Sequence, residues 1–249
     1  MSKTLQNKIA LVTGGSTGIG LGIAQEFVHQ GAFVFITARR KQQLDDALAQ
    51  LGNQATGIQA DVADLDSLDQ VFAQIKTQKG HLDIVVANAG GGEFAPLGAI
   101  TEAQFDHTFN INVKGVLFTV QKSLPLLAKG ASVILTGSTT SAIGGKNFSV
   151  YSATKAAVRN FARSWIQDLA GQDIRINVLS PGPVQTPGLM GLVEPDQQQA
   201  LLQQMASLVP LGRVGQPAEI GKVAVFLASD AASFVNGAEL FADGGQAQI

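Results

Sequence analysis

Residues 9–20 read Ile9-Ala-Leu-Val-Thr13-Gly14-Gly15-Ser16-Thr17-Gly18-Ile19-Gly20. Five apolar or β-branched residues, typical of a buried strand, lead directly into a glycine-rich turn and then into a helical pattern. Glycines let such a turn bring backbone N–H groups close to a pyrophosphate at the helix N-terminus, where the helix dipole favours anions. The spacing is G-x-x-x-G-x-G rather than G-x-G-x-x-G. The order strand, glycines, helix nevertheless favours nucleotide binding over an ordinary turn.

Short apolar runs alternate with helical patterns along almost the whole chain. Runs that are apolar on both sides suit strands covered on both faces, and strand–helix alternation implies right-handed crossovers. The predicted strands are 9–13, 33–37, 55–59, 84–87, 132–136, 174–179 and 239–241, and the predicted helices are about 18–30, 41–51, 64–79, 101–128, 150–170 and 216–229. We predict one α/β domain over residues 1–249, with a doubly wound parallel sheet of about seven strands and helices on both faces.

Composition excludes several classes of function. The net charge is −2 and there is no basic run, so we expect no nucleic acid partner. The chain has no cysteine, which excludes disulfides, a thiol nucleophile and zinc–thiolate sites. No apolar run is long enough to span a membrane, and the first strand begins too early to leave room for a signal peptide. We expect a soluble, cytoplasmic protein.

A second chemical signal is the stretch Tyr151-Ser-Ala-Thr-Lys155. Residues at i and i+4 of a helix lie on one face, so Lys155 can reach under the Tyr151 ring. An unperturbed tyrosine has a pKa of about 10, and a nearby positive charge lowers it. We therefore expect Tyr151 to be a proton donor whose pKa Lys155 lowers. Exposed helices also carry Y-x-x-x-K by chance, so the pattern alone leaves a solvated helix face open.

Six motifs occur together in a fixed order. They are Thr13-Gly-x-x-x-Gly-Ile-Gly20, Asn88-Ala-Gly90, Asn112 in Ile-Asn-Val-Lys-Gly, Ser138, Tyr151-x-x-x-Lys155 and Pro181-Gly182. With this set the chain resembles the short-chain dehydrogenase/reductase family over nearly its whole length. The resemblance implies a Rossmann-type fold, a nicotinamide cofactor and a small carbonyl or alcohol substrate.

The resemblance assigns catalytic roles to Asn112, Ser138, Tyr151 and Lys155. Tyr151 would protonate the carbonyl oxygen of a ketone or aldehyde, or deprotonate an alcohol in the reverse direction. Lys155 would lower the tyrosine pKa and hold the nicotinamide ribose. Asn112 would kink its helix and hold a water that links Lys155 to solvent; an ordinary buried amide is the alternative.

Ser138 would hydrogen-bond the substrate oxygen and stabilise the charge that develops there. It follows the predicted fifth strand, at the carboxyl end of the sheet where ligands collect. Thr139 and Ser141 are nearby rivals for this role, and any of the three could instead be an ordinary turn residue.

The cofactor is predicted from the resemblance to be NADP(H). In this fold an acidic residue at the end of the second strand selects NAD, but Ala38 occupies that position and Arg39 follows it. A guanidinium suits a 2′-phosphate, although a solvated basic helix start is the alternative. The predicted cofactor-binding residues are Gly14, Ser16, Thr17, Gly18, Ile19, Gly20, Arg39, Arg40, Asp61, Val62, Asn88, Ala89, Gly90, Tyr151, Lys155, Pro181, Gly182, Val184 and Thr186. No metal site is predicted.

The substrate is expected to lie under a mobile lid at about residues 186–210, as in the family, with a glutamine-rich helix at about 196–207. The apolar character of this stretch favours a hydrophobic ketone or aldehyde. The candidate substrate contacts are Leu189, Met190, Leu192 and Val193 in the lid, and Glu93, Phe94, Ile143 and Phe148 outside it. For the last four, simple packing is the alternative.

Two other functions remain open. Some relatives are 3-oxoacyl-[acyl-carrier-protein] reductases, but docking an acidic carrier needs a basic rim, and residues 186–212 contain no lysine or arginine. Other proteins of this fold bind a dinucleotide only as a sensor, and they have usually lost the tyrosine or lysine that this chain retains. We predict an NADPH-dependent carbonyl reductase or alcohol dehydrogenase. Relatives are commonly homotetramers built on the helices at 101–128 and 150–170, with a monomer as the alternative here.

Overall fold

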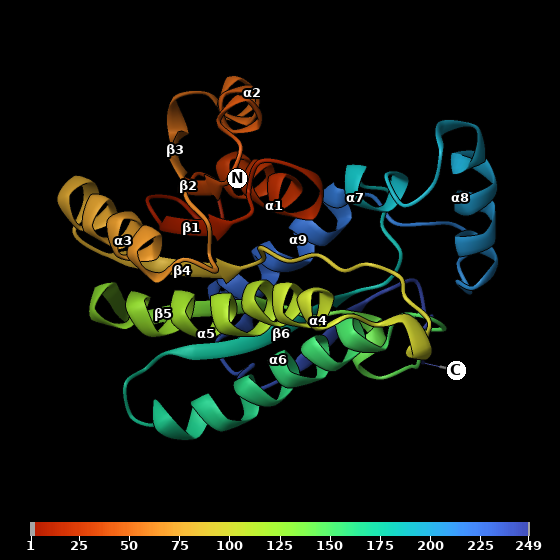
Figure 1. Ribbon diagram of the computed structural model, residues 1–249. Helices are drawn as coiled ribbons and strands as arrows, with labels where there is room; N and C mark the ends of the chain where they lie inside the picture. Colours follow the sequence, from red (N-terminus) through yellow and green to blue (C-terminus); the bar gives the residue numbers. More distant parts are fainter. Residues whose placement is uncertain (1–2, 249) are drawn as a thin grey trace.

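Seven parallel strands form one sheet in the order β3-β2-β1-β4-β5-β6-β7 (Figure 1). The computed structural model describes residues 3–248; residues 1–2 and 249, which the single-domain prediction includes, lie outside the described part. The strands are β1 (Ile9–Thr13), β2 (Phe33–Ala38), β3 (Ala55–Gln59), β4 (Leu82–Ala87), β5 (Leu127–Thr136), β6 (Arg175–Pro181) and β7 (Glu239–Ala242). The predicted doubly wound parallel sheet of Rossmann type is confirmed.

Side chains alternate between the two faces of the sheet, which explains why the central strands are apolar throughout. In β1, Ala10 and Val12 belong to one hydrophobic cluster, and Ile9 and Leu11 belong to another. The first cluster includes residues of α1 (Gly18–His29), α2 (Lys41–Leu51) and α9 (Pro217–Ala228). The second includes residues of α3 (Leu65–Lys79), α5 (Gly115–Ser123) and α6 (Ser149–Asp168). Helices therefore cover both faces, as predicted. No helix within residues 3–248 is long and apolar enough to cross a membrane.

The helix predicted at about 101–128 is present over residues 102–126, but it is not one regular α-helix. The chain forms α4 (Glu102–Phe109), a π-helical turn (Asn110–Lys114) and α5. A short 3₁₀ turn containing Pro125 then ends the helix, because proline lacks the N–H that a helix needs, and β5 begins at Leu127 rather than 132. The π-helical turn contains the buried Asn112, and such turns occur often at functional sites.

The carboxyl ends of β1, β4 and β5 are fastened together by Asn88, the first residue after β4. Its Nδ2 donates to the Thr13 carbonyl oxygen (3.0 Å), and its backbone N–H donates to the Thr13 hydroxyl (3.0 Å). The Thr136 hydroxyl at the end of β5 donates to Asn88 Oδ1 (3.4 Å). The sheet order reverses between β1 and β4, and ligands of such sheets bind at this point.

The predicted lid contains two helices, α7 (Pro187–Met190) and α8 (Gln198–Ser207). The second matches the predicted glutamine-rich helix, preceded by a 3₁₀ turn at Pro195–Gln197. Figure 1 shows α8 standing away from the sheet and its covering helices, and none of its residues is buried. The lid is therefore joined to the body mainly through its two ends.

Candidate active site

A cavity of about 330 Å³ opens where the glycine-rich turn meets the ends of β2, β3 and β4. Many of the predicted cofactor-binding residues line it. They are Gly14, Ser16, Thr17, Arg39, Arg40, Asp61, Val62, Ala89 and Gly90. The cavity therefore collects residues from four segments of the predicted nucleotide site that lie far apart in the sequence.

The glycine-rich turn is shaped to receive an anion. Gly14 and Gly18 have φ of +64° and +54°, which residues with a Cβ rarely adopt. A Cβ at Gly20 would come within 2.2 Å of the Gly14 carbonyl oxygen, so only glycine lets the turn close against α1. Thr17 caps α1 without a side-chain hydrogen bond, and the first turn has no acidic residue. The backbone N–H groups of the first turn of α1 are thus available for a phosphate, and this arrangement suits a dinucleotide.

The end of β2 gives the cavity a basic wall. Arg39 and Arg40 are exposed and line the cavity, and Ala38 is buried beside them. The Gln59 side chain holds the Arg39 carbonyl oxygen (2.9 Å) and so fixes the backbone there. Within residues 3–248, neither arginine has a carboxylate partner within 4.0 Å. Two guanidinium groups are therefore left for an anionic ligand.

Sequence reasoning missed several residues that line this cavity. They are Gln43, Gly91, Gly92, His107, Thr108 and Ile111. Glu93, which we expected to contact substrate, lines the same cavity. Gly91 and Gly92 follow directly after the Asn88-Ala-Gly90 motif, so their position in the sequence was the available signal.

The four predicted catalytic residues lie together at the carboxyl end of the sheet. Lys155 is only 3% exposed, and its Nζ donates to the Thr136 carbonyl oxygen (2.8 Å) and lies 5.4 Å from the centre of the Tyr151 ring. The Ser138 side chain lies beside Tyr151, close enough to favour its ionised form. A Cβ at Gly90 would come within 3.1 Å of Asn112 Oδ1 and 3.4 Å of Lys155 Nζ, so the cavity wall touches both residues.

The side chain of Asn112 binds protein groups rather than facing solvent. Its Oδ1 accepts from Gly91 N (3.0 Å), and its Nδ2 donates to Gly91 O (2.8 Å) and Thr154 Oγ1 (3.0 Å). Thr154 Oγ1 in turn donates to the Tyr151 carbonyl oxygen (2.6 Å). The Asn112 side chain therefore joins the loop after β4 to α6.

Burial dominates the pKa values of the pair. It raises the pKa of Tyr151 to about 12, and the nearby Ser138 side chain offsets only part of this increase. Burial lowers the pKa of Lys155 to about 8. In the ligand-free protein, burial therefore outweighs the lowering of the tyrosine pKa that we expect from Lys155. At the pH where a buried phenol ionises, Lys155 has already lost its proton and offers no positive charge.

Aromatic rings cover one side of Tyr151. The Phe148 ring stacks on it at 4.4 Å between centroids, and the Phe94 ring packs on Phe148 at 4.5 Å. Gly92 lies close to the Tyr151 ring, since a Cβ there would come within 2.5 Å of it. Phe94 is 50% exposed, so this apolar wall faces the outside of the site. Within residues 3–248 no three acidic or histidine side chains are grouped to hold a metal ion.

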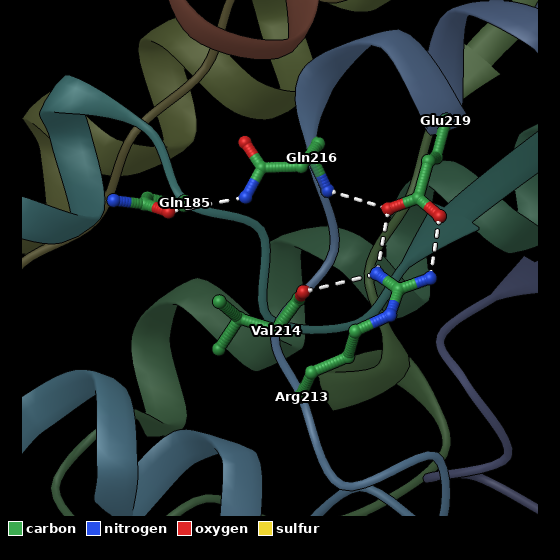
Figure 2. Close-up of polar contacts among 5 residues, drawn as sticks. All are labelled: Gln185, Arg213, Val214, Gln216 and Glu219. Carbon is green, nitrogen blue, oxygen red and sulfur yellow. Dashed lines mark hydrogen bonds and ion pairs between the residues drawn. The ribbon is translucent and has the colours of Figure 1, made fainter.

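The two ends of the lid are held together at its base. Gln185 N donates to Gly215 O (2.9 Å), and Gln216 Nε2 donates to Gln185 Oε1 (3.1 Å). Figure 2 shows that Arg213 then makes two hydrogen bonds to Glu219 (2.8 and 2.7 Å), whose carboxylate also accepts from Gln216 N. The Arg213 hydrogen bonds lower the Glu219 pKa to about 2, so the Glu219 carboxylate at the base of the lid is charged throughout the neutral range.

The remaining predicted cofactor residues surround the lid base. Thr186, the first lid residue, lies beside the glycine turn, because a Cβ at Gly18 would come within 3.3 Å of its side chain. Val184 is 5% exposed, and its side chain packs in the cluster under α9. Pro181 ends β6, and Gly182 packs against Asp243. Any contact of Val184 with a nicotinamide would therefore have to come from its backbone.

Tyr151 is the only tyrosine of the chain, so phenolate absorbance reports on it alone. We predict a titration midpoint near 12 in the protein without ligand, with no phenolate signal between pH 7 and about 9. The measurement is ultraviolet absorbance against pH, limited to the pH range in which circular dichroism shows the fold intact. Tyr151→Phe provides the blank. A midpoint below 10 in the folded protein would mean that Lys155, rather than burial, controls this phenol.

Comparison with known proteins agrees with this geometry. The family model described as Enoyl-(Acyl carrier protein) reductase matches residues 14–247. Oxidoreductase asL5 of Sarocladium schorii is 47% identical over 247 residues, covering 98% of each chain. Hydroxynaphthalene reductase-like protein Arp2 of Metarhizium guizhouense is 34% identical over 263 residues, covering 98% of this chain and 96% of that one.

A solved structure shares the fold over nearly its full length. It is the crystal structure titled short-chain dehydrogenase/reductase SDR:Glucose/ribitol dehydrogenase from Brucella melitensis, with a TM-score of 0.92, 30% identity and 99% coverage of both chains. Members of this family bind a nicotinamide dinucleotide on their Rossmann fold. The chain belongs to the short-chain dehydrogenase/reductase family of oxidoreductases.

Proposed function

We propose that the protein catalyses the reversible, NADPH-dependent reduction of a ketone or aldehyde to an alcohol. The observation that carries the proposal is the group of Tyr151, Ser138 and Lys155 beside the cavity of the glycine-rich turn. Tyr151 and Lys155 come from α6 and Ser138 comes from the segment after β5, and a solvated helix face or an ordinary turn residue would not bring them together. A nicotinamide, when bound, supplies the hydride for the carbonyl carbon.

The residues of the chain handle the proton and the charge. With a pKa near 12, Tyr151 holds its proton at neutral pH and is therefore ready to act as the acid. A carbonyl oxygen that gains the electrons of the C=O bond becomes alkoxide-like and more basic than a phenolate. The proton then passes from the Tyr151 hydroxyl to that oxygen. The Ser138 hydroxyl stabilises the developing charge, and protonated Lys155 favours the phenolate left behind.

The substrate we propose is apolar and carries a ring. Support comes from Phe94 and Phe148, which extend an aromatic wall outward from Tyr151, and from the half-buried Leu189 and Met190 in the lid. Aromatic rings pack well against one another at such distances. The printed name of the Metarhizium relatives, hydroxynaphthalene reductase-like, fits a ring-bearing substrate.

A carrier-bound substrate is less well supported. The name of the matching family model refers to an acyl carrier protein, and such a carrier is an acidic partner. Residues 186–212, which include the whole lid, contain no lysine or arginine, and Gln172-Asp173 precedes β6. We therefore favour a free carbonyl compound. We further propose a cytoplasmic homotetramer, which sizing by light scattering at working concentration would check.

Arg39 is proposed to select NADPH through the 2′-phosphate. Replacing Arg39 with Asp exchanges an attractive for a repulsive charge, so we expect a ten- to hundredfold or greater loss of NADPH affinity, about 1.5–3 kcal/mol. Binding titrations with NADPH and NADH measure it. Lys41→Asp makes the same charge change two residues away, at a side chain that pairs with Asp45. Equal losses in both variants, or an unchanged NADPH preference in Arg39→Asp, would remove this assignment.

The function itself is tested by following NADPH oxidation on a panel of ketones and aldehydes, with ring-bearing and aliphatic members. Tyr151→Phe should lower kcat about 10²- to 10⁴-fold, because the acid is lost while the ring stack is kept. NADPH binding should change little. If the parent protein binds NADPH but none of the carbonyl compounds causes its oxidation, the sensor alternative replaces the enzyme.

A further inference from the structure

One carboxylate, that of Glu239 at the start of β7, contacts several parts of the site. Its Oε1 accepts hydrogen bonds from the hydroxyls of Ser141 (2.7 Å) and Ser180 (2.8 Å). Its Oε2 lies 3.7 Å from an Arg159 guanidinium nitrogen. The side chain is only 11% exposed. A carboxylate buried to this extent needs such partners, and here the partners come from three different elements.

Two of these contacts fix the segment that contains Ser138. Ser141 ends the 3₁₀ turn Thr139–Ser141, which Ser138 caps by accepting from Thr140 N (3.2 Å). Ser141 N also donates to the Ser138 carbonyl oxygen (3.0 Å). On the other side of Ser138, Gly137 packs against Ser180. A Cβ at Gly137 would come within 2.2 Å of the Ser180 hydroxyl oxygen. Glu239 therefore holds both ends of this segment.

The third contact leads to the tyrosine. Arg159 is eight residues after Tyr151 and four after Lys155 in α6, so the three side chains lie along one face of the helix. Glu239 is therefore connected to Ser138 through Ser141 and to Tyr151 through the rigid helix that contains Arg159. Because Ser138 also lies beside Tyr151, Glu239 is linked to both members of this pair.

We propose that Glu239 is a positioning residue, which sets the place of the Ser138 hydroxyl relative to Tyr151. The proposal rests on the function proposed above, in which these two groups act on one substrate oxygen. Glu239 does not itself reach the reacting atoms. Misplacement of a catalytic group by about 1 Å can lower a rate by up to about a hundredfold, so the effect is measurable.

The kinetic test uses Glu239→Leu, Glu239→Gln and a double variant. Glu239→Leu should lower kcat ten- to a hundredfold with KM for NADPH unchanged. Glu239→Gln keeps an Oε1 acceptor for both serines and should stay within about threefold of the parent. In a Ser138→Ala background, Glu239→Leu should change kcat less than about twofold, because its effect passes through Ser138. A full further loss in that background would overturn the proposal.

A second readout needs no substrate. Tyr151 is the only tyrosine, so protein labelled with 3-fluorotyrosine gives one ¹⁹F resonance from the site. Ser138→Ala should shift this resonance, Glu239→Leu should shift it in the same direction, and Glu239→Gln should not. Asp83→Leu is the matched control, since Asp83 is a similarly buried carboxylate (14% exposed) that binds Lys8 and the Ile9 N–H. It should lower the melting temperature without moving the resonance.

The two readouts separate failure of this proposal from failure of the proposed function. If the parent reduces no carbonyl compound, the function fails, and the ¹⁹F resonance still decides whether Glu239 positions Ser138. If Glu239→Leu leaves the resonance where the parent has it, or shifts it no more than Asp83→Leu does, Glu239 is an ordinary ion-pair partner of Arg159 and the proposal is wrong.

Discussion

The buried ammonium group of Lys155 is the constraint on which the site depends. A cation removed from water is unfavourable unless it is hydrogen-bonded or paired, and Lys155 has the Thr136 carbonyl oxygen at 2.8 Å. That oxygen lies at the end of β5, next to the strand ends that Asn88 fastens together. Gly90 leaves room for the ammonium, and Tyr151 lies over it. This one charge therefore depends on the order of the strands, on the turn after β4 and on the position of α6.

Most of the fold could be predicted from the sequence because its signals are local. Apolar runs such as 9–13 and 33–37 alternate side chains between two cores, so they identify strands covered on both faces. The helix predicted at 101–128 contains a π-helical turn that local periodicity could not predict. Its apolar periodicity continues through Asn110–Lys114, whereas the π-helical turn accompanies long-range hydrogen bonds from Asn112 to Gly91 and Thr154. Contacts between residues 21 and 42 positions apart leave no mark on a local pattern.

Part of the candidate site could likewise be predicted from the sequence, and part could not. The motifs gave Ser138, Tyr151 and Lys155 correctly as neighbours, and Arg39 as part of the cavity wall. They did not give the direction of the tyrosine pKa, because burial depends on the Phe148 ring and Gly92, which no motif includes. Nor did they give Glu239 or the polar contacts at the base of the lid, which act through side chains of ordinary types in the last third of the chain. Spacing predicts which groups meet, and packing decides their chemistry.

The central claim is that Lys155 is buried as an ionisable cation under the only tyrosine, and the pH dependence of stability tests it directly. A folded-state pKa of about 8 lies below the unfolded value of about 10.4, so the unfolded chain binds more protons between these values and stability rises with pH there. Relative to Lys155→Met, the parent should gain about 3 kcal/mol of unfolding free energy between pH 7 and about 10.5. A difference between the two proteins that stays constant over this range would contradict the account.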